Sequence, residues 1–418
     1  MGKYVETNVG IVRVRRLRPE KRRVLLHTNN TRRYERLRRS PWRVPPFTRP
    51  LGVPTVVAEV TDEQLRQIHD WGDVEVTLDT QFALTASAVP SAAPWQTKTQ
   101  ADVMRHINAH RAWTITRGAG PVIAVIDTGV NVLPEFRRRS AWSRSFVYRS
   151  PWSDAIGHGT MCAAIACGSA AHGGRYDGVA PEADLLSARC ELRLSEVHNL
   201  LEHLLGLRRD GAFPKGLVVC MSFGVPAAQT AVTRAAYPLT RLIQAATAAG
   251  VVFVCSAGNY HDHHTHTPSA DRPNSIWGVN SLDDVISVGA VDWDETNQRY
   301  PWSHAESSRG PGEWASTVTK PDVVAPTYGE VLYGRSYEHR EWWGTSGAAP
   351  QVAGLAALLL SINPSFTPAQ ILQITRQSAR RLNAPKTCVG EGIIDCEAAL
   401  RVAGVGSARG KAVGGGTV

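Results

Sequence analysis

Long apolar runs and a secretion signal are both absent from this sequence of 418 residues. No apolar stretch approaches the roughly 20 residues that a membrane-spanning helix needs, so no membrane partner is expected. The first twenty residues hold five Lys or Arg and lack the apolar core of a Sec-type signal peptide. These absences favour a cytoplasmic protein and leave open secretion by another route.

Cysteine is sparse, and its seven residues are scattered along the chain. An odd, scattered set does not form a disulfide framework, and without a signal peptide a reducing compartment is the better expectation. Cys388 and Cys396 are close enough in sequence to invite a bridge, which the sequence does not establish. The other five cysteines lie among apolar or small residues, as buried thiols do: Cys162, Cys167, Cys190, Cys220 and Cys255.

The basic excess of the chain lies entirely in its first fifty residues. Residues 1–50 carry 15 Lys or Arg and 3 Asp or Glu, whereas the rest of the chain is slightly acidic. Any nucleic-acid role would therefore belong to that segment alone. A solvated arm, or an arm docked on an acidic face of its own protein, is the simpler interpretation and disfavours a nucleic-acid partner.

Three regions are expected along the chain. For residues 1–95 we expect a basic arm, a small α+β domain and a linker. The linker is expected because residues 86–94 are rich in Pro, Ala and Ser. Residues 407–418 predict a flexible, Gly-rich tail. The expected elements of the first region are a loop or extended arm over 28–50, strands over 53–60 and 74–78, and a helix over Asp62–His69 that a capping box (Thr61, Gln64) opens.

Residues 96–406 alternate apolar runs with helical stretches, which predicts an α/β domain with a mostly parallel sheet covered on both faces. In such sheets, ligands bind beyond the carboxyl ends of the strands. The expected strands cover residues 121–126, 217–221, 251–255 and 285–290.

Ser346 precedes an uncharged run of Ala, Val and Leu that reaches Leu360, which predicts a buried helix with Ser346 at its amino end. Unpaired N–H groups and the helix dipole favour negative charge at that end. Pro350 is expected in the first turn, and Gly354 suggests that another backbone passes close by. An ordinary core helix with a capping Ser is the alternative.

Two further residues occupy suggestive positions. Asp127 ends the apolar strand over 121–126, where a buried carboxylate is costly without a partner. His158 opens a helix of small residues. Alone, each is more typical of a turn, a cap or a core residue, but the combination with Ser346 suggests nucleophilic catalysis.

The chain from about Gly118 to Arg401 strongly resembles the subtilisin-like serine proteases, or subtilases. Its Asp, His and Ser motifs follow that family's order. The matching segments are Val125–Gly129, Gly157–Thr160 and Gly344–Pro350, with support from Gly178–Pro181, Met221–Gly224, Ser256–Asn259 and Lys320–Pro326.

The resemblance implies roles for single residues. Ser346 would attack the scissile carbonyl, His158 would accept its proton, and Asp127 would orient the imidazole. Asn259 would supply an oxyanion-hole donor beside the Ser346 N–H. The segments that would line the specificity pocket and pair with substrate are Ser222, Phe223, Gly224 and Ser256, Ala257, Gly258. The chain departs from the family at Met161, Gly347 and Gln351, none of which carries a proton.

A resemblance to the family's inhibitory propeptide implies that residues 1–95 fold on the protease domain and occupy its groove. Many subtilases carry structural calcium, but its ligands are not assignable in this sequence. Four His and one Asp over 261–266 could bind a transition metal. Their spacing matches no standard zinc pattern, so no metal ligand is predicted there.

The sequence thus predicts a serine endopeptidase that acts on protein or peptide substrates and is restrained by its own N-terminal domain. A peptide-maturing or peptide-ligating subtilase would use the same triad, and the sequence does not separate the two. A catalytically silent, protease-like peptide-binding module is the non-enzymatic alternative, which the intact triad disfavours.

Overall fold

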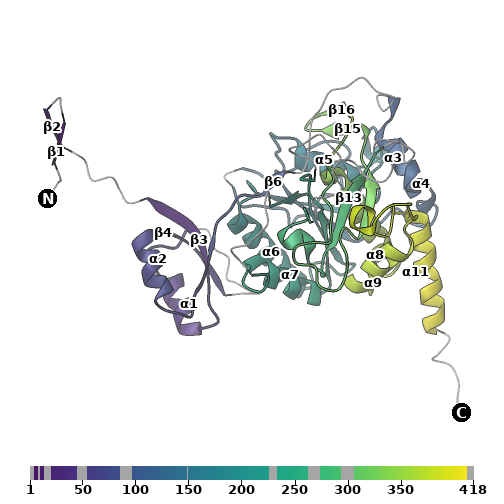
Figure 1. Ribbon diagram of the computed structural model, residues 1–418. Coiled ribbons are helices and arrows are strands. Elements are labelled where there is room, and N and C mark those ends of the chain that lie inside the picture. Colours follow the sequence, from purple (N-terminus) through teal and green to yellow (C-terminus); the bar gives the residue numbers. More distant parts are fainter. Residues whose placement is uncertain are drawn as a thin grey trace, which may run out of the picture. The chain divides into compact units, whose positions relative to one another are not determined.

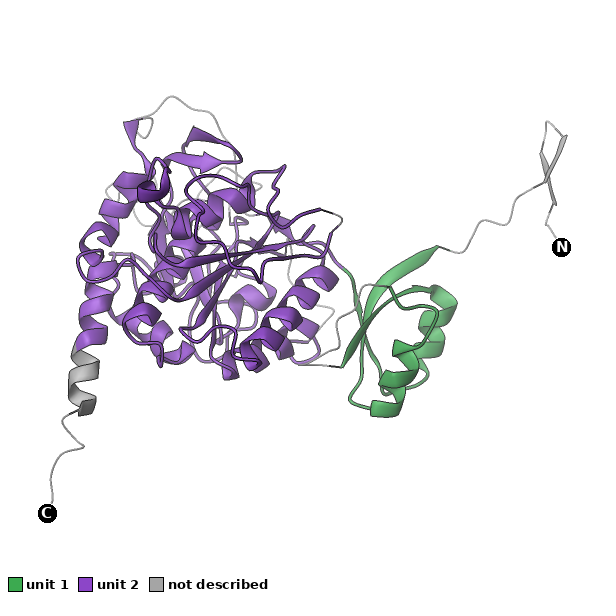
Figure 2. Ribbon diagram, turned by 180° about the vertical axis from the view of Figure 1, so that it is seen from behind, with its two compact units in different colours: residues 1–79 green, residues 80–418 purple. Residues whose placement is uncertain are grey.

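A computed structural model of the chain divides it into two compact units, Met1–Asp79 and Thr80–Val418 (Figure 2). The described residues are 4–7, 10–13, 20–44, 54–84, 97–147, 149–225, 233–261, 274–292 and 306–411. The predicted linker over 86–94 lies outside them, as do most of the histidines of the run over 261–266.

The first unit contains a three-stranded antiparallel sheet of order β4-β3-β5, with helices α1 and α2 against one face (Figure 1). Alternate strand residues such as Val24, Leu26 and Val56 form a small core with Leu37 and Ile68 of the helices. A separate hairpin, β1 (Tyr4–Thr7) and β2 (Gly10–Arg13), precedes the sheet. The other elements are β3 (Lys21–His27), α1 (Thr31–Arg38), β4 (Thr55–Thr61), α2 (Asp62–His69) and β5 (Glu75–Leu78).

The prediction for α2 is confirmed, and the prediction of an extended arm over 28–50 is wrong in part. Thr61 caps α2 and forms the expected capping box with Gln64. In the predicted arm, α1 forms because the Asn30 side chain accepts a hydrogen bond from the Arg33 N–H, and Leu37 is buried.

The second unit is built on a seven-stranded sheet of order β14-β13-β12-β10-β7-β9-β8, and every pair in it is parallel. This confirms the expected α/β class. The four expected strands correspond to β7 (Val122–Asp127), β10 (Leu217–Met221), β12 (Val251–Ser256) and β13 (Ile286–Val291). The others are β8 (Arg144–Ser145), β9 (Asp184–Arg189) and β14 (Val323–Pro326), with two-stranded sheets β6 (Ala83–Leu84)–β11 (Phe223–Gly224) and β15 (Gly329–Tyr333)–β16 (Ser336–Arg340).

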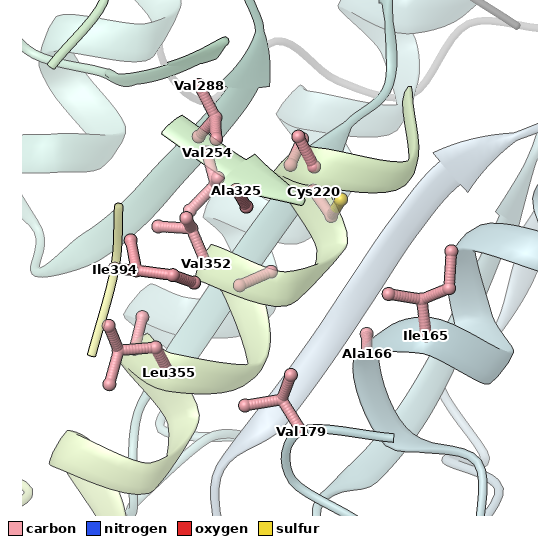
Figure 3. Close-up of a cluster of buried hydrophobic side chains, with 14 of the residues drawn as sticks. Ile165, Ala166, Val179, Cys220, Val254, Val288, Ala325, Val352, Leu355 and Ile394 are labelled. Atoms are coloured by element: carbon pink, nitrogen blue, oxygen red, sulfur yellow. The ribbon is translucent and has the colours of Figure 1, made fainter. Parts of the chain in front are cut away.

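Helices α5 (His158–Cys167) and α8 (Thr345–Ile362) pack together on one face of this sheet. Alternate strand residues, including Cys220, Val254 and Val288, join them in one core (Figure 3). Helices α6 (Leu194–Arg209) and α7 (Pro238–Ala248) pair with each other, and α7 contacts β12. The remaining helices are α3 (Gln100–His106), α4 (Ala109–Ala112), α9 (Pro368–Gln377), α10 (Lys386–Val389), α11 (Cys396–Lys411) and the 3-10 turns η2 (Ala170–His172) and η3 (Gly278–Ser281). Helix α11 thus passes the predicted domain end at residue 406.

Helix α8 is the centre of the core. Its residues are buried from Thr345 to Leu360, as predicted. In the described part of the chain it alone is long and apolar enough to span a bilayer, yet 89% of it is buried inside the protein. Gly354 lets α8 approach α5, because a Cβ there would lie 3.0 Å from the Ala166 carbonyl and 2.5 Å from the Val179 Cβ. The close backbone predicted from Gly354 is therefore present.

Candidate active site

Three neighbouring strands of the large sheet end at the same level and bring candidate residues together. Met221 of β10 pairs with Ile126 of β7 and with Cys255 of β12. The next residues along these strands are Asp127, Ser222 and Ser256. This is the carboxyl edge of a parallel sheet, where ligands are expected to bind.

Asp127 and His158 form a buried pair at this edge. The His158 Nδ1 lies 2.8 and 2.9 Å from the two Asp127 carboxylate oxygens, and neither side chain has exposed surface. The Thr128 N–H donates to Asp127 Oδ1 at 2.7 Å. Such a carboxylate fixes the tautomer in which Nδ1 carries the proton and Nε2 accepts one.

Asp154 holds the start of helix α5, where His158 lies. Its carboxylate accepts five hydrogen bonds, from the Thr128 hydroxyl, the Ile156 and Gly157 N–H groups, and the N–H and hydroxyl of Thr160. Gly157 itself has φ +95°, a conformation that favours glycine. These contacts fasten the His158 turn to the end of β7.

Ser346 is the second residue of α8, and Pro350 determines which groups hydrogen-bond to the Ser346 carbonyl. Pro350 lies inside the helix and not in its first turn, which corrects the prediction. Because proline has no N–H, the Ser346 carbonyl lacks its donor four residues on. That carbonyl instead accepts from the Ser222 hydroxyl at 3.2 Å and from the Cys162 thiol at 3.6 Å. The Cys162 sulfur is 3.9 Å from His158 Nδ1, so this thiol lies between the His158 ring and the Ser346 backbone.

The Ser346 hydroxyl donates to the Ser222 carbonyl at 2.9 Å. The His158 Nε2 is buried and has no hydrogen-bond partner among the described residues. Because Nδ1 donates to Asp127, Nε2 carries the lone pair of the neutral ring and can accept a proton. Catalytic hydrogen bonds often form only when substrate is bound.

Asn259 lies beside the start of α8. Its Oδ1 accepts from the Thr345 N–H at 3.1 Å and from the Thr345 hydroxyl at 2.8 Å. That hydroxyl also accepts from the Gly258 N–H at 3.1 Å. The Asn259 amide is therefore fixed next to Ser346, with its Nδ2 at the opposite end of the planar group.

The two predicted pocket segments are joined by Asn280, a residue that no sequence motif singled out. Its Nδ2 donates to the Phe223 and Ser256 carbonyls, both at 2.7 Å. Asn280 belongs to η3, and it is buried. Ala257 continues the second segment by donating its N–H to the Val288 carbonyl at 2.8 Å.

The departures from the subtilase pattern have physical reasons in this fold. At Gly347, a Cβ would lie 2.6 Å from the Trp343 Cβ, so a larger residue would collide with it. Gln351 donates to the Pro326 and Gly347 carbonyls at 2.7 and 2.9 Å. Met161 is fully buried in the core.

A segment of the chain itself, Thr80–Leu84, lies in this site as an added strand. Leu84 pairs with Phe223 and Ala83 with Gly224 in the antiparallel β6–β11 ladder. On the other side, the Phe82 N–H donates to the Leu192 carbonyl at 2.8 Å, and the Leu194 N–H donates to the Thr80 carbonyl at 2.9 Å. The Phe82 ring packs against the Phe223 ring, 5.1 Å between centroids.

The described residues offer little for a metal ion. Asp127, His158 and Cys162 form the only such group of three among them, with ligand atoms within 4.8 Å. A metal there would have to replace the hydrogen bonds between Asp127 and His158. A thiol and an imidazole also suit soft ions and not calcium, which takes oxygen ligands.

The sequence of this chain is similar to those of known proteins. Residues 118–393 match the sequence profile of the subtilase family. The serine protease AprX of Bacillus subtilis is 28% identical over 304 residues, covering 67% of this chain and 66% of the relative. The calcium-dependent protease of a Nostoc species is 28% identical over 315 residues, covering 67% of this chain and 45% of the relative. The chain therefore spans between about half and two thirds of these relatives.

Solved structures agree on the fold. The epidermin leader peptide processing serine protease of Staphylococcus aureus superposes with a TM-score of 0.67 at 16% identity, covering 92% of this chain and all of that one. At such identity the likeness concerns the fold alone.

Proposed function

Because the chain belongs to the subtilase family, we propose that it is a serine endopeptidase in which Ser346, His158 and Asp127 cleave peptide bonds. The observation that carries the proposal is the buried Asp127–His158 pair at the sheet edge where Ser346 begins helix α8. The Ser346 Oγ attacks the scissile carbonyl, and its proton passes to His158 Nε2. Asp127 stabilises the imidazolium, which then gives the proton to the leaving amine.

Substrate binding would release the nucleophile. A residue one register step beyond Leu84 in an added strand lies opposite Ser222, whose carbonyl now accepts from the Ser346 hydroxyl. A substrate N–H at that place competes for the carbonyl. The freed hydroxyl can then turn to Nε2. The tetrahedral oxyanion would be bound by the Ser346 N–H and by Asn259 Nδ2, worth roughly 100- to 1,000-fold in kcat for the side-chain donor, a figure from subtilisin itself.

The strand β6 supports restraint of the enzyme by its own chain. Thr80–Leu84 follows the first unit directly and takes the hydrogen-bonding groups of β11 that a substrate strand would need. On this proposal the N-terminal unit acts as an intramolecular inhibitor, and we infer from the β6–β11 register that self-processing cuts between Thr85 and Ala86.

The test is to purify the wild type and Ser346→Ala and to measure the mass of each amino terminus. The wild type should lose about 85 residues, and Ser346→Ala should stay intact. Ser361→Ala is the matched control on the same helix, because its hydroxyl contacts Thr116 far from the site. An intact wild type, or equal trimming of Ser346→Ala, would show that self-processing is wrong.

A fluorophosphonate probe tests the chemistry independently of processing. It should label wild-type Ser346 and leave Ser346→Ala and His158→Ala unlabelled. Absence of label on folded wild type, judged by an unchanged thermal midpoint, would favour the silent peptide-binding module.

Calcium binding is a separate proposal. A relative is named as a calcium-dependent protease, and calcium prefers several oxygen ligands. Among the described residues, the acidic side chains form no cluster that would hold calcium.

A further inference from the structure

Strand β6 does not fill the cavity beside it. This cavity of about 480 Å³ remains open while the Leu84 side chain lines it. Leu84 is only half-buried, so its side chain leaves this volume unfilled. Its lining includes Phe82, Leu84, Ile156, Leu192, Arg149 and Arg189.

Arg189 provides a fixed, buried cation in this cavity. It is 9% exposed and ends strand β9. Its Nη1 donates to the Ser150 carbonyl at 3.3 Å and to the Ser153 carbonyl. A guanidinium has five N–H groups, so two carbonyls leave donors for other acceptors.

Among the described residues, Arg189 forms no ion pair, although charges of both signs lie around it. Burial lowers the pKa of Arg189, and the neighbouring Arg149 lowers that pKa further, while Asp154 and Glu191 act in the opposite sense. The Asp154 carboxylate already accepts five hydrogen bonds from other groups. Glu191 also lines the cavity, but it is exposed to solvent, which screens its charge.

We propose that this cavity, the Arg189 pocket, binds an acidic side chain of the peptide substrate, with Glu preferred, at the position that Leu84 occupies in β6. This inference rests on the proposed function and names its substrate class. Glu reaches further than Leu, and a carboxylate matches a guanidinium in both geometry and charge. The chain's own strand, with Leu84 there, is a poorer fit and can be displaced by substrate.

The experiment uses the wild-type protein as purified and four quenched fluorescent peptides that copy residues 80–87, with Glu, Gln, Leu or Lys at the position of Leu84. Glu should exceed Leu in kcat/KM by about tenfold, the factor expected for one hydrogen bond to a charged group. Glu should also exceed Gln, which has nearly the same size, and Lys should be the poorest. A ratio of Glu to Leu at or below one, or equal rates for Glu and Gln, would overturn the inference.

Variants assign the preference to the pocket. Arg149→Ser should lower the Glu/Leu ratio severalfold, and Arg189→Met should bring it to about one. Arg189 donates to two loop carbonyls, so Arg189→Met could unfold the protein. Arg149 is exposed, so Arg149→Ser tests the pocket even if Arg189→Met does not fold. Arg138→Ser, an exposed arginine paired with Asp184, is the control and should leave the ratio unchanged.

Two outcomes separate this inference from the proposed function. If Ser346 takes the fluorophosphonate label but Glu is not preferred, only the Arg189 pocket is wrong. If none of the peptides is cleaved and no label appears, the protease function fails, and this inference falls with it. In the full-length chain, Leu84→Glu should slow the first turnover of the Leu peptide and Leu84→Lys should speed it; the reverse order would count against the pocket.

Discussion

Replacing Asp127 with Asn tests the Asp127–His158 pair most directly. The wild-type carboxylate offers two acceptors to His158 Nδ1 and also accepts from the Thr128 N–H. If the Asn oxygen keeps the Thr128 contact, its NH2 group faces Nδ1. The ring must then carry its proton on Nε2 and cannot accept the proton of Ser346. This wrong tautomer costs about 10⁴ in kcat in a related triad, or roughly 5 kcal/mol of barrier.

The assay is steady-state hydrolysis of the Leu peptide at pH 8, with equal thermal midpoints confirming the fold. We expect KM to change by less than about threefold, because Asp127 has no exposed surface and touches no substrate. Asp184→Asn is the charge-matched control: Asp184 begins β9, and its side chain is 37% exposed. Its kcat should stay within about twofold. If Asp127→Asn keeps kcat within tenfold of the wild type, the reasoning about the tautomer is refuted.

Three further predictions concern stability and the thiols. Gly354→Ala should lower the thermal midpoint, because overpacking against Val179 costs about 1–3 kcal/mol and outweighs the helix propensity gained; a higher midpoint would contradict this. Burial raises the pKa of Asp283, but hydrogen bonds from Ser316 and Thr317 and the charge of Arg234 lower this pKa on balance. The ionised Asp283 carboxylate therefore stabilises the fold above a pH of about 4, and this stabilisation is lost as the pH falls. Asp283→Asn should therefore reduce the urea-derived free energy of unfolding at pH 7 and leave it nearly unchanged at pH 2; equal losses at both pH values would be evidence against the reasoning. All seven cysteines are free and buried, and burial raises the pKa of Cys220 to about 12, so Ellman's reagent should find no thiol in the native protein and seven in guanidinium without reductant; five would reveal a Cys388–Cys396 bridge.

Elements with strong local signals were predictable from the sequence. Helix α2 was placed because Thr61 and Gln64 form a capping box within four residues. The strand ending at Asp127 was placed by an uninterrupted apolar run. In contrast, α1 was missed because its arginines outnumber its apolar residues, and only Leu37 is buried along it.

The motif residues of the site were predictable, but the residues that hold them were not. Asp154 bonds to Thr128, 26 residues away, and Asn280 bonds to Phe223, 57 residues away. Such contacts follow from tertiary packing, which no local pattern encodes. The position of Pro350 in its helix was wrongly predicted for the same reason. The apolar run is compatible with a helix that begins two residues before Pro350 and with one that begins five residues before it, as observed.

The tether of strand β6 to the rest of the chain has a consequence for dilution. A separate inhibitor dissociates when the solution is made more dilute, but a segment on the same polypeptide keeps a constant effective concentration near β11. Dilution therefore does not release β6 from β11. The lag before full activity should therefore have a first-order rate constant that does not depend on the protein concentration, as long as β6 stays covalently attached.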